Sequence, residues 1–224
     1  MLAVDCFSAL EELDSIRARW TELYELDAHA NFFLSWEWLH ACLATQETRW
    51  LILGVREADG PYLAFLPLSC PRIPSRGPVL TRELSLAGSP RADVTGMLGI
   101  TGEERRFIPA LVREIKGLRW DTFTLNDYAD ARIAELVAEL GASGYRATLG
   151  AQTPCPYIEL PATWSEYLDS RSHATRRTIR AKLRRIESLP GYRLDFAPPS
   201  EAEAAIQRLL RMNSLRWGKD PRIW

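Results

Sequence analysis

The spacing of apolar side chains over residues 8–26 predicts an amphipathic helix. Apolar residues recur there every three or four positions, at Leu13, Ile16, Trp20, Leu23 and Tyr24. Ser8 and Glu11 have the spacing of a capping box at the start of this helix. Ser35 then follows a short linker and is the expected N-cap of a second, short helix.

The period next changes from helical to strand-like. Residues 50–57 and 62–68 are rich in apolar residues and predict two strands. Asp59 and Gly60 lie between them, and this pair favours a tight turn with positive φ angles. We therefore expect an antiparallel hairpin.

Further strands and helices are expected up to residue 152. A capping box formed by Thr101 and Glu104 opens one of these helices, which Gly117 ends. The expected elements are strands at 81–86, 93–99, 120–125 and 145–152 and helices at 101–117 and 130–140.

Helices dominate the rest of the chain. A capping box formed by Thr163 and Glu166 opens a helical region with a break near residue 171. Ser200 and Glu203 have the same spacing before a last helix with one apolar face. Short strands are expected at 157–160 and 192–196, but a lone strand offers no sheet to cover that face. The sequence thus predicts an α/β protein whose last helix is left uncovered.

The composition is that of a globular protein. Of 224 residues, 46% are hydrophobic and 25% are charged, which excludes disordered and fibrous classes. No stretch approaches the roughly 18 apolar residues of a membrane span, and no signal peptide opens the chain. No CxxC pair is present, so reduced thiols without a zinc site are expected at Cys6, Cys42, Cys70 and Cys155. We expect a cytoplasmic protein without a metal.

Several short segments resemble one family of acyltransferases. In order and spacing they are similar to the CelD/BcsL-like acetyltransferases of the GNAT superfamily, whose catalytic part is also called the BioF2-like domain. The segments are Phe33-Leu-Ser-Trp-Glu-Trp-Leu39, Phe65-Leu-Pro-Leu68, Trp120-Asp-Thr-Phe-Thr-Leu125, Cys155-Pro-Tyr-Ile-Glu-Leu-Pro161, Trp164-Ser-Glu-Tyr-Leu168, the basic run 173–185 and Leu215-Arg-Trp217. This family is related to the Fem peptidyltransferases and has two GNAT-like units in tandem.

The resemblance implies a fold, a domain layout and an activity. It implies a mixed, largely antiparallel sheet flanked by helices in a degenerate GNAT-like domain at 1–152, a linking strand and basic helical region at 153–189, and the start of a second GNAT-like acyltransferase domain at 190–224. It further implies transfer from acetyl-CoA or another acyl-CoA to an amine or hydroxyl acceptor, such as a sugar, in bacterial polysaccharide or cell-envelope biosynthesis. The acyl-CoA site is expected mostly beyond Trp224, so the 224-residue chain is expected to be inactive alone.

Two other functions stay open. One is a non-catalytic docking or acceptor-binding module, and the other is a Fem-like transferase that uses aminoacyl-tRNA. Catalytic residues are not assigned, since Asp93 and Asp127 have the positions of turn and cap residues. The chain contains no GxSxG, Walker or HExxH pattern, which argues against hydrolase, nucleotide-triphosphatase and zinc-protease functions.

The first unit is not expected to bind CoA. A GNAT unit holds the CoA pyrophosphate on backbone N–H groups at the start of its central helix. Here the junction at 97–106 lacks the superfamily's Arg/Gln-x-x-Gly-x-Gly/Ala pattern. Glu103 and Glu104 also put two carboxylates where the phosphates would lie.

Positive charge is concentrated late in the chain. Residues 1–150 carry 15 Lys and Arg against 21 Asp and Glu, whereas residues 151–224 carry 13 against 8. The segment 171–185 alone has seven cationic residues and no acidic one. This asymmetry suggests different roles for the two parts.

The helical period groups the cations of this segment. On a helix, one face would carry the four candidate site residues His173, Arg177, Arg180 and Arg184. Ile179, Leu183 and Ile186 would form a separate, buried stripe.

Three interpretations of the cationic face stay open. It is a solvated surface, or a phosphate site for a nucleotide-sugar, a lipid-phosphate acceptor or the 3′-phosphate of CoA, or a contact for RNA such as tRNA. His173 is a candidate general base or only a member of this face.

Overall fold

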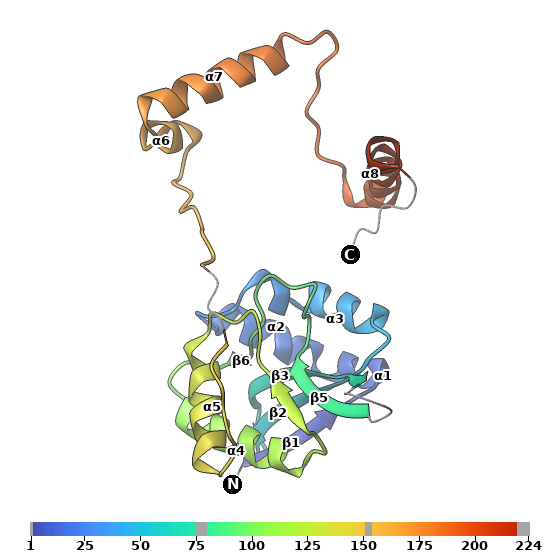
Figure 1. The fold of residues 1–224 in the computed structure, drawn as a ribbon, viewed down its shortest axis with the longest axis vertical. Coiled ribbons are helices and arrows are strands. Elements are labelled where there is room, and N and C mark those ends of the chain that lie inside the picture. Colours follow the sequence, from blue (N-terminus) through green and yellow to red (C-terminus); the bar gives the residue numbers. More distant parts are fainter. Residues whose placement is uncertain (1, 75–79, 151–153, 219–224) are drawn as a thin grey trace. The chain divides into compact units, whose positions relative to one another are not determined.

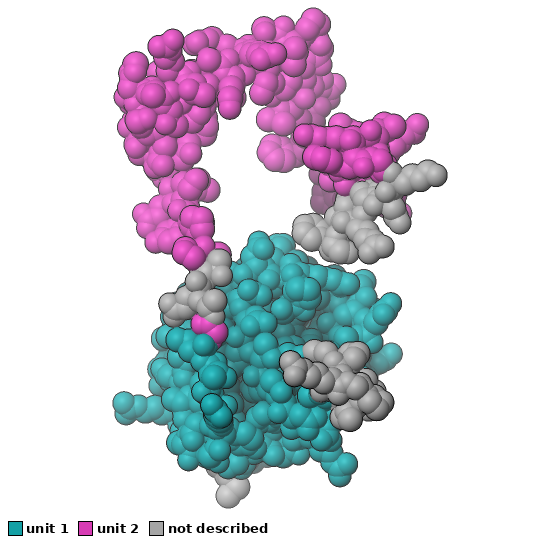
Figure 2. Space-filling view, viewed as in Figure 1, with its two compact units in different colours: residues 1–149 teal, residues 150–224 magenta. Residues whose placement is uncertain are grey.

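The computed structural model describes residues 2–74, 80–150 and 154–218. The chain divides into unit 1, residues 1–149, and unit 2, residues 150–224 (Figure 2). Unit 1 holds a sheet with helices packed on both of its faces (Figure 1). The predicted fold class, a mixed and largely antiparallel sheet flanked by helices, is confirmed.

The predicted hairpin forms the middle of the sheet. Strand β2 (Arg49–Glu57) pairs antiparallel with β3 (Tyr62–Cys70), so this prediction is confirmed. The predicted turn geometry is wrong, because neither Asp59 nor Gly60 has a positive φ. Four residues connect the strands, and the Gly60 amide donates to the Glu57 carbonyl at 3.2 Å. A longer loop reverses the chain without the left-handed residues that a two-residue turn requires.

The sheet extends on both sides of this hairpin. Its order is β1-β2-β3-β5-β4, and β6 pairs with β3 while β7 pairs with β5. All described pairs of strands are antiparallel except β5 with β7. The bounds are β1 (Leu2–Phe7), β4 (Arg72–Pro74), β5 (Leu80–Leu86), β6 (Leu98–Gly99) and β7 (Thr122–Thr124).

Two cores lie on opposite faces of the sheet because strand side chains alternate. Ile52 and Phe65 point to the helices that precede the hairpin, and Leu53 and Leu66 point to the helices that follow it. The first group is α1 (Leu10–Leu13), α2 (Arg17–Leu26) and α3 (Trp36–Thr45), with 3₁₀ turns at Asp14–Ile16 and Phe32–Leu34. The second is α4 (Glu104–Gly117) and α5 (Ala131–Ala142).

The helix ends differ from the predicted capping. The helix expected over 8–26 is confirmed, although a 3₁₀ turn interrupts it. The carboxylate of Glu12, and not that of Glu11, accepts from the Ser8 and Ala9 amides at 2.8 and 3.0 Å. Ser35 is the N-cap of α3 but its side chain makes no capping hydrogen bond. The spacing predicts where a helix begins, but the local backbone decides which carboxylate reaches the free N–H groups.

Three predicted strands of unit 1 are shortened or absent, and the one expected at 120–125 is reduced to β7. The strand expected at 93–99 is reduced to β6, and residues 145–150 form no strand, while 151–153 lie outside the described residues. Strand β1 was not predicted, although it pairs with β2 along its whole length, from Leu2 opposite Glu57 to Phe7 opposite Ile52. A strand exists only where a neighbour accepts its hydrogen bonds, and apolar periodicity does not report that neighbour.

Unit 2 contains helices in its described part and no strand. Helix α6 (Trp164–Asp169) begins at the predicted capping box, where the Glu166 amide donates to Thr163 Oγ1 at 3.2 Å. The break near residue 171 is also confirmed, before α7 (His173–Glu187). A 3₁₀ turn (Pro199–Glu201) leads into α8 (Ala202–Trp217), which has no side-chain cap at the predicted box. The prediction of strands at 157–160 and 192–196 is wrong, because neither segment forms a strand.

The described residues of unit 2 form almost no core. Leu168 is their one buried side chain. The predicted buried stripe on α7 is wrong, since Leu183 and Ile186 are 37% and 41% exposed. As expected, the apolar side chains of α8 are uncovered, at Ile206, Leu209, Met212, Leu215 and Trp217. Both results have one cause, because the described residues of unit 2 contain no sheet on which these helices could pack.

None of the helices among the described residues has the length and hydrophobicity needed to cross a membrane.

A polar cluster joins the three strands β1, β2 and β3. Asp5 Oδ2 accepts from Arg56 Nε at 2.6 Å and from the Tyr62 hydroxyl at 2.7 Å. The hydrogen bond from Arg56 holds the pKa of Asp5 below its ordinary value despite some burial. Burial and the hydrogen bond to Asp5 raise the pKa of Tyr62 to about 12. The cluster is therefore best satisfied with Asp5 ionised and Tyr62 protonated.

This arrangement predicts a pH dependence of stability at both ends of the scale. The folded chain keeps the Tyr62 proton up to about pH 12, whereas an unfolded tyrosine loses it near pH 10. The contribution of Tyr62 is thus complete below pH 10 and is lost as the pH rises toward 12. Asp5 has the opposite sign, because its contribution is present above pH 3.8 and is lost as the pH falls through its lowered folded pKa.

Comparison with Tyr62→Phe tests the alkaline side of this dependence. The variant is expected to be less stable than the natural chain at about pH 9, and the difference in unfolding free energy should shrink toward about pH 11. Urea unfolding followed by circular dichroism at each pH measures the unfolding free energy of the natural chain and of the variant. A difference that stays constant over this range would show that the Tyr62 hydroxyl does not titrate differently in the folded chain.

Candidate functional site

The four candidate side chains lie together on α7. His173, Arg177, Arg180 and Arg184 are exposed and line one cavity of about 500 Å³ that is open to solvent, together with Arg176 and with Asp169 of α6. Side chains four, seven and eleven positions after the first residue return to nearly the same face of a helix. The N-cap Ser172 fixes where this helix begins, since its Oγ accepts from the Thr175 amide at 3.2 Å.

The positive charge of this face is poorly compensated. Arg176 Nη1 lies 3.4 Å from Asp169 Oδ1. Among the described residues, no carboxylate lies within ion-pair distance of Arg177, Arg180 or Arg184. The first turn of α7 has no acidic residue, and the positive end of the helix dipole opposes the cations there, whereas Arg184 lies in the last turn, where the dipole favours a cation. Each pair of like charges three or four positions apart also costs about 0.2–0.5 kcal/mol.

His173 lacks the partner of a general base. In the described part of the chain, no carboxylate is hydrogen-bonded to its ring, and Asp169 contacts Arg176 instead. A catalytic imidazole is normally oriented by such a partner. The geometry therefore makes His173 a member of the cationic face and gives it no oriented proton-transfer role.

Unit 1 contains a buried cluster of charges that the sequence analysis missed. Arg132, at the start of α5, donates through Nη2 to Asp27 Oδ2 at 2.9 Å and to Asp130 Oδ2 at 2.7 Å. All three side chains are almost fully buried. Burial by itself lowers the pKa of Arg132, but hydrogen bonds to both carboxylates hold it above its ordinary value. The cluster links the end of α2 to the start of α5.

A signal for this cluster was present in the sequence. Arg132 lies four positions before Leu136 and eight before Leu140, on the apolar face of α5. A charged residue on a buried helical face needs a partner. Asp130 was the nearest candidate, and it is also the N-cap of α5, where its side chain accepts from the Arg132 amide. Asp27 lies too far away in the sequence to be found in this way.

Two side chains of the same cluster are hydrogen-bonded to the backbone of β6. The Gly99 amide donates to Asp27 Oδ2 at 2.9 Å, and the Gly99 carbonyl accepts from Arg132 Nη1 at 3.3 Å. A Cβ added to Gly99 would lie 2.8 Å from Cζ of Phe107. The end of β6 is therefore filled by side chains of unit 1 and offers no free N–H group to a ligand.

The start of α4 is also occupied by the protein's own carboxylates. Glu104 Oε1 accepts from the Gly102 amide at 3.1 Å, and Glu103 Oε2 pairs with Arg106 Nη1 at 2.6 Å. Phosphates bind to free N–H groups and positive charge at a helix start. Two carboxylates at this position repel phosphates. A CoA molecule held at the start of α4 does not fit the residues present in unit 1.

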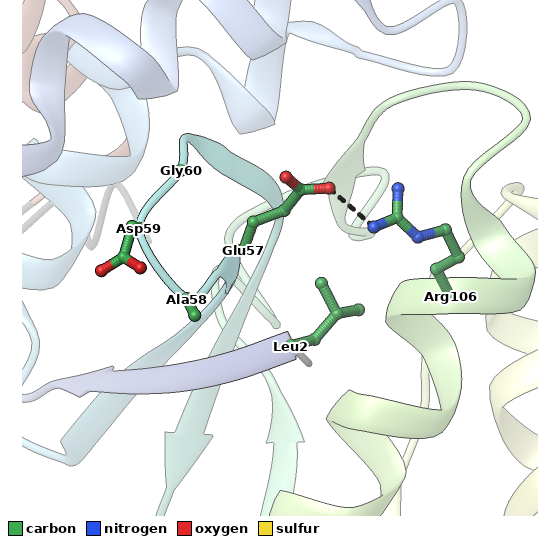
Figure 3. A pocket seen from close by; sticks show the side chains of 6 residues that line it. All are labelled: Leu2, Glu57, Ala58, Asp59, Gly60 and Arg106. Atoms are coloured by element: carbon green, nitrogen blue, oxygen red, sulfur yellow. Dashed lines mark hydrogen bonds and ion pairs between the residues drawn. The ribbon is translucent and has the colours of Figure 1, made fainter.

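A second cavity lies beside the loop between β2 and β3. Figure 3 shows Glu57 pointing toward Arg106 across it. Their ion pair measures 2.7 Å, and Arg106 also pairs with Glu103, so its charge is fully engaged. The cavity has a volume of about 650 Å³ and is lined by Leu2, Glu57, Ala58, Asp59, Gly60 and Arg106. Its acidic lining does not suit a phosphorylated ligand.

The remaining polar residues suggest no reaction centre. Asp127 has φ 55° in a turn, where its carbonyl accepts from the Thr95 amide at 2.6 Å, as expected of a turn residue. Cys6, Cys42, Cys70 and Cys155 are not joined by disulfides. Burial raises the pKa of the Cys42 and Cys70 thiols, which keeps them protonated. The described residues include no group of three or more His, Cys, Asp or Glu placed to hold a metal ion.

No protein-family model and no curated protein matches this chain. Among solved structures it is similar to the aminoglycoside 6′-N-acetyltransferase AAC(6′)-Ih from Acinetobacter baumannii, at 16% identity over 71% of this chain and 100% of that one, with a TM-score of 0.44. The enzyme AAC(6′)-IG from Acinetobacter haemolyticus is 17% identical over 70% of this chain and 99% of that one, with a TM-score of 0.43.

A third solved structure is AAC(6′)-Iy in complex with the bisubstrate analogue CoA-S-monomethyl-acetylneamine. It is 14% identical over 70% of this chain and 99% of that one, with a TM-score of 0.42. Likeness at this level does not extend to activity, since one fold supports many functions. The residues of this chain are what bear on its own function.

Proposed function

We propose that this chain is part of a GNAT-type acyltransferase that acts on acetyl-CoA or another acyl-CoA in bacterial polysaccharide or cell-envelope biosynthesis. The observation that carries this proposal is the order of elements in unit 1. Helices α2 and α3, the hairpin of β2 and β3, the strands β4, β5 and β6, the long helix α4, strand β7 and helix α5 follow one another as in a GNAT unit. Three of the segments that resemble the CelD/BcsL-like family, 33–39, 65–68 and 120–125, lie at α3, β3 and β7 of unit 1, and the others lie in unit 2.

The proposed reaction is direct acyl transfer. An amine or hydroxyl of the acceptor attacks the thioester carbonyl carbon, a C–N or C–O bond forms, and the C–S bond breaks. The CoA thiolate leaves, and the proton lost by the acceptor balances its charge. No residue of the described chain is assigned as the base for this proton.

Unit 1 is proposed to support this reaction without performing it. Its β6 amide is bonded to Asp27, and the start of α4 is bordered by Glu103 and Glu104. We therefore propose that acyl-CoA binds outside unit 1. The second candidate function is a non-catalytic docking or acceptor-binding module. It is favoured by the same observation, that carboxylates of unit 1 lie where a CoA pyrophosphate would bind.

A thiol-release assay distinguishes these functions. The 224-residue chain and the complete product of its gene would each be mixed with several acyl-CoAs and with amine or sugar acceptors, and free CoA would be detected with a thiol-reactive dye. The 224-residue chain is expected to release no CoA, because carboxylates of unit 1 already occupy the N–H groups at β6 and at the start of α4. The complete gene product is expected to release CoA only with an acceptor.

Two outcomes would contradict this. Absence of acceptor-dependent release from the complete gene product would favour the docking module. Equal release from both polypeptides would show that the chemistry takes place within these 224 residues.

A further inference from the structure

We propose that the cationic face of α7 is a binding site for a diphosphate ester, and this rests on the proposed acyltransferase function. Arg176 lines the same cavity as the four predicted residues of this face, His173, Arg177, Arg180 and Arg184, and is included in it here. Two sources of a diphosphate are compatible with acyl transfer. One is a nucleoside-diphosphate or lipid-diphosphate acceptor, and the other is the CoA donor, which carries a diphosphate of its own.

The distribution of the cations distinguishes this face from a solvated helix surface. Residues 171–185 contain seven Lys and Arg, and four of these line the cavity with His173. Arg171, Lys182 and Arg185 lie outside it. A helix that only needed solubility would gain nothing from gathering like charges, because neighbouring cations repel one another. A bound anion removes this repulsion.

The length of the face suits a diphosphate better than a single phosphate. Arg177 and Arg184 are seven residues apart, which is about 10 Å along a helix. One phosphate group is too small to contact guanidinium groups along that whole distance, whereas two linked phosphates extend further. The planar fork of arginine also matches the geometry of phosphate oxygens and donates two hydrogen bonds at once.

The one acidic residue that lines the cavity makes one end of it less positively charged than the other. Asp169 lies next to Arg176, at 3.4 Å between Oδ1 and Nη1. Its carboxylate partly neutralises that end of the face and repels an anion there. Arg180 and Arg184 have no such neighbour among the described residues. The diphosphate is thus expected nearest to Arg177, Arg180 and Arg184.

A pair of matched double variants tests the site in the 224-residue chain. Arg177→Gln with Arg180→Gln removes two charges from the face, and Lys182→Gln with Arg185→Gln removes two charges from α7 outside the cavity. Titration calorimetry would use inorganic pyrophosphate and inorganic phosphate as probes. Pyrophosphate is expected to bind about 10-fold tighter than phosphate, and only the first variant should weaken it, by about 10-fold.

Circular dichroism shows whether α7 keeps its helical content in both variants. An equal loss of pyrophosphate affinity in the two variants would contradict the proposal and indicate that these residues form only a solvated surface. Absence of pyrophosphate binding to the natural chain would indicate the same. A single-stranded RNA that binds more tightly than pyrophosphate, and that both variants weaken equally, would also overturn the proposal, because a nucleic-acid contact of this kind depends on total charge.

The source of the diphosphate is found with two further probes. If uridine diphosphate binds the natural chain but not the first variant, the site is assigned to the acceptor. If CoA binds the natural chain but not the first variant, the site is assigned to the donor. Either result supports the diphosphate site. If neither uridine diphosphate nor CoA binds, the proposal is contradicted. These are binding measurements without acyl transfer, so their failure is distinct from a failure of the thiol-release assay.

Discussion

Replacing Arg132 with Met is expected to destabilise the chain by about 3–5 kcal/mol, because it leaves the buried carboxylates of Asp27 and Asp130 without a cation. Arg132 Nη2 contacts both, at 2.9 and 2.7 Å. Methionine fills a similar volume, so the loss reports on charge more than on a cavity. Urea unfolding followed by far-ultraviolet circular dichroism measures the change in unfolding free energy.

Arg82 provides the matched control. It pairs with Asp121 at 3.1 Å, but both side chains are nearly half exposed. An exposed pair of this kind contributes little because solvent screens it, so Arg82→Met is expected to have a small effect on the unfolding free energy. If both variants lost the same small amount, the cluster of Arg132 could not be a dry, buried network.

A rescue variant separates charge from packing at the same place. Asp27→Asn and Asp130→Asn, added to Arg132→Met, keep the side-chain oxygens that accept from the Gly99 and Arg132 amides but remove both negative charges. Breaking a buried ion pair costs more than removing it entirely. The triple variant is therefore expected to be more stable than Arg132→Met alone. No recovery would mean that the loss comes from packing.

Replacing Trp20 with Ala is expected to cost about 3–5 kcal/mol, through the cavity it leaves between α2 and the sheet. Trp20 is fully buried, and its ring is stacked on that of Phe65 with centroids 5.0 Å apart. Its Nε1 also donates to the Leu34 carbonyl at 2.9 Å, and this acceptor would be left without a partner. The same unfolding measurement applies.

Trp217 is the control for this substitution. It is 71% exposed on α8, so Trp217→Ala changes the same side chain without opening a cavity. Its effect on unfolding free energy is expected to stay within about 0.5 kcal/mol. A loss at Trp217 comparable to that at Trp20 would mean that α8 is covered in solution, either by another part of the chain or by a second copy.

The predicted elements that were confirmed depend on local signals. The helix over 8–26, the hairpin of β2 and β3, and the capping box at Thr163 were all predicted from spacing within a few residues. The face shared by His173, Arg177, Arg180 and Arg184 follows from the helical period alone, once α7 is a helix. Local periodicity therefore determined the element types and the grouping of the candidate site.

Tertiary structure decided the features that depend on distant neighbours. Strand β1 forms because β2 offers it an edge, whereas residues 145–150, with strand-like periodicity, have no partner among the described residues and form no strand. Asp27 and Arg132 lie 105 positions apart, so only the tertiary fold, in which both side chains reach Gly99 of β6, brings them together. The sequence by itself determined the helices, the central hairpin and the cationic face of α7. Only the tertiary structure decided which strands pair, which charges are buried and which helical faces are covered, because hydrogen bonds between strands and the burial of charge both require a partner that the local sequence does not contain.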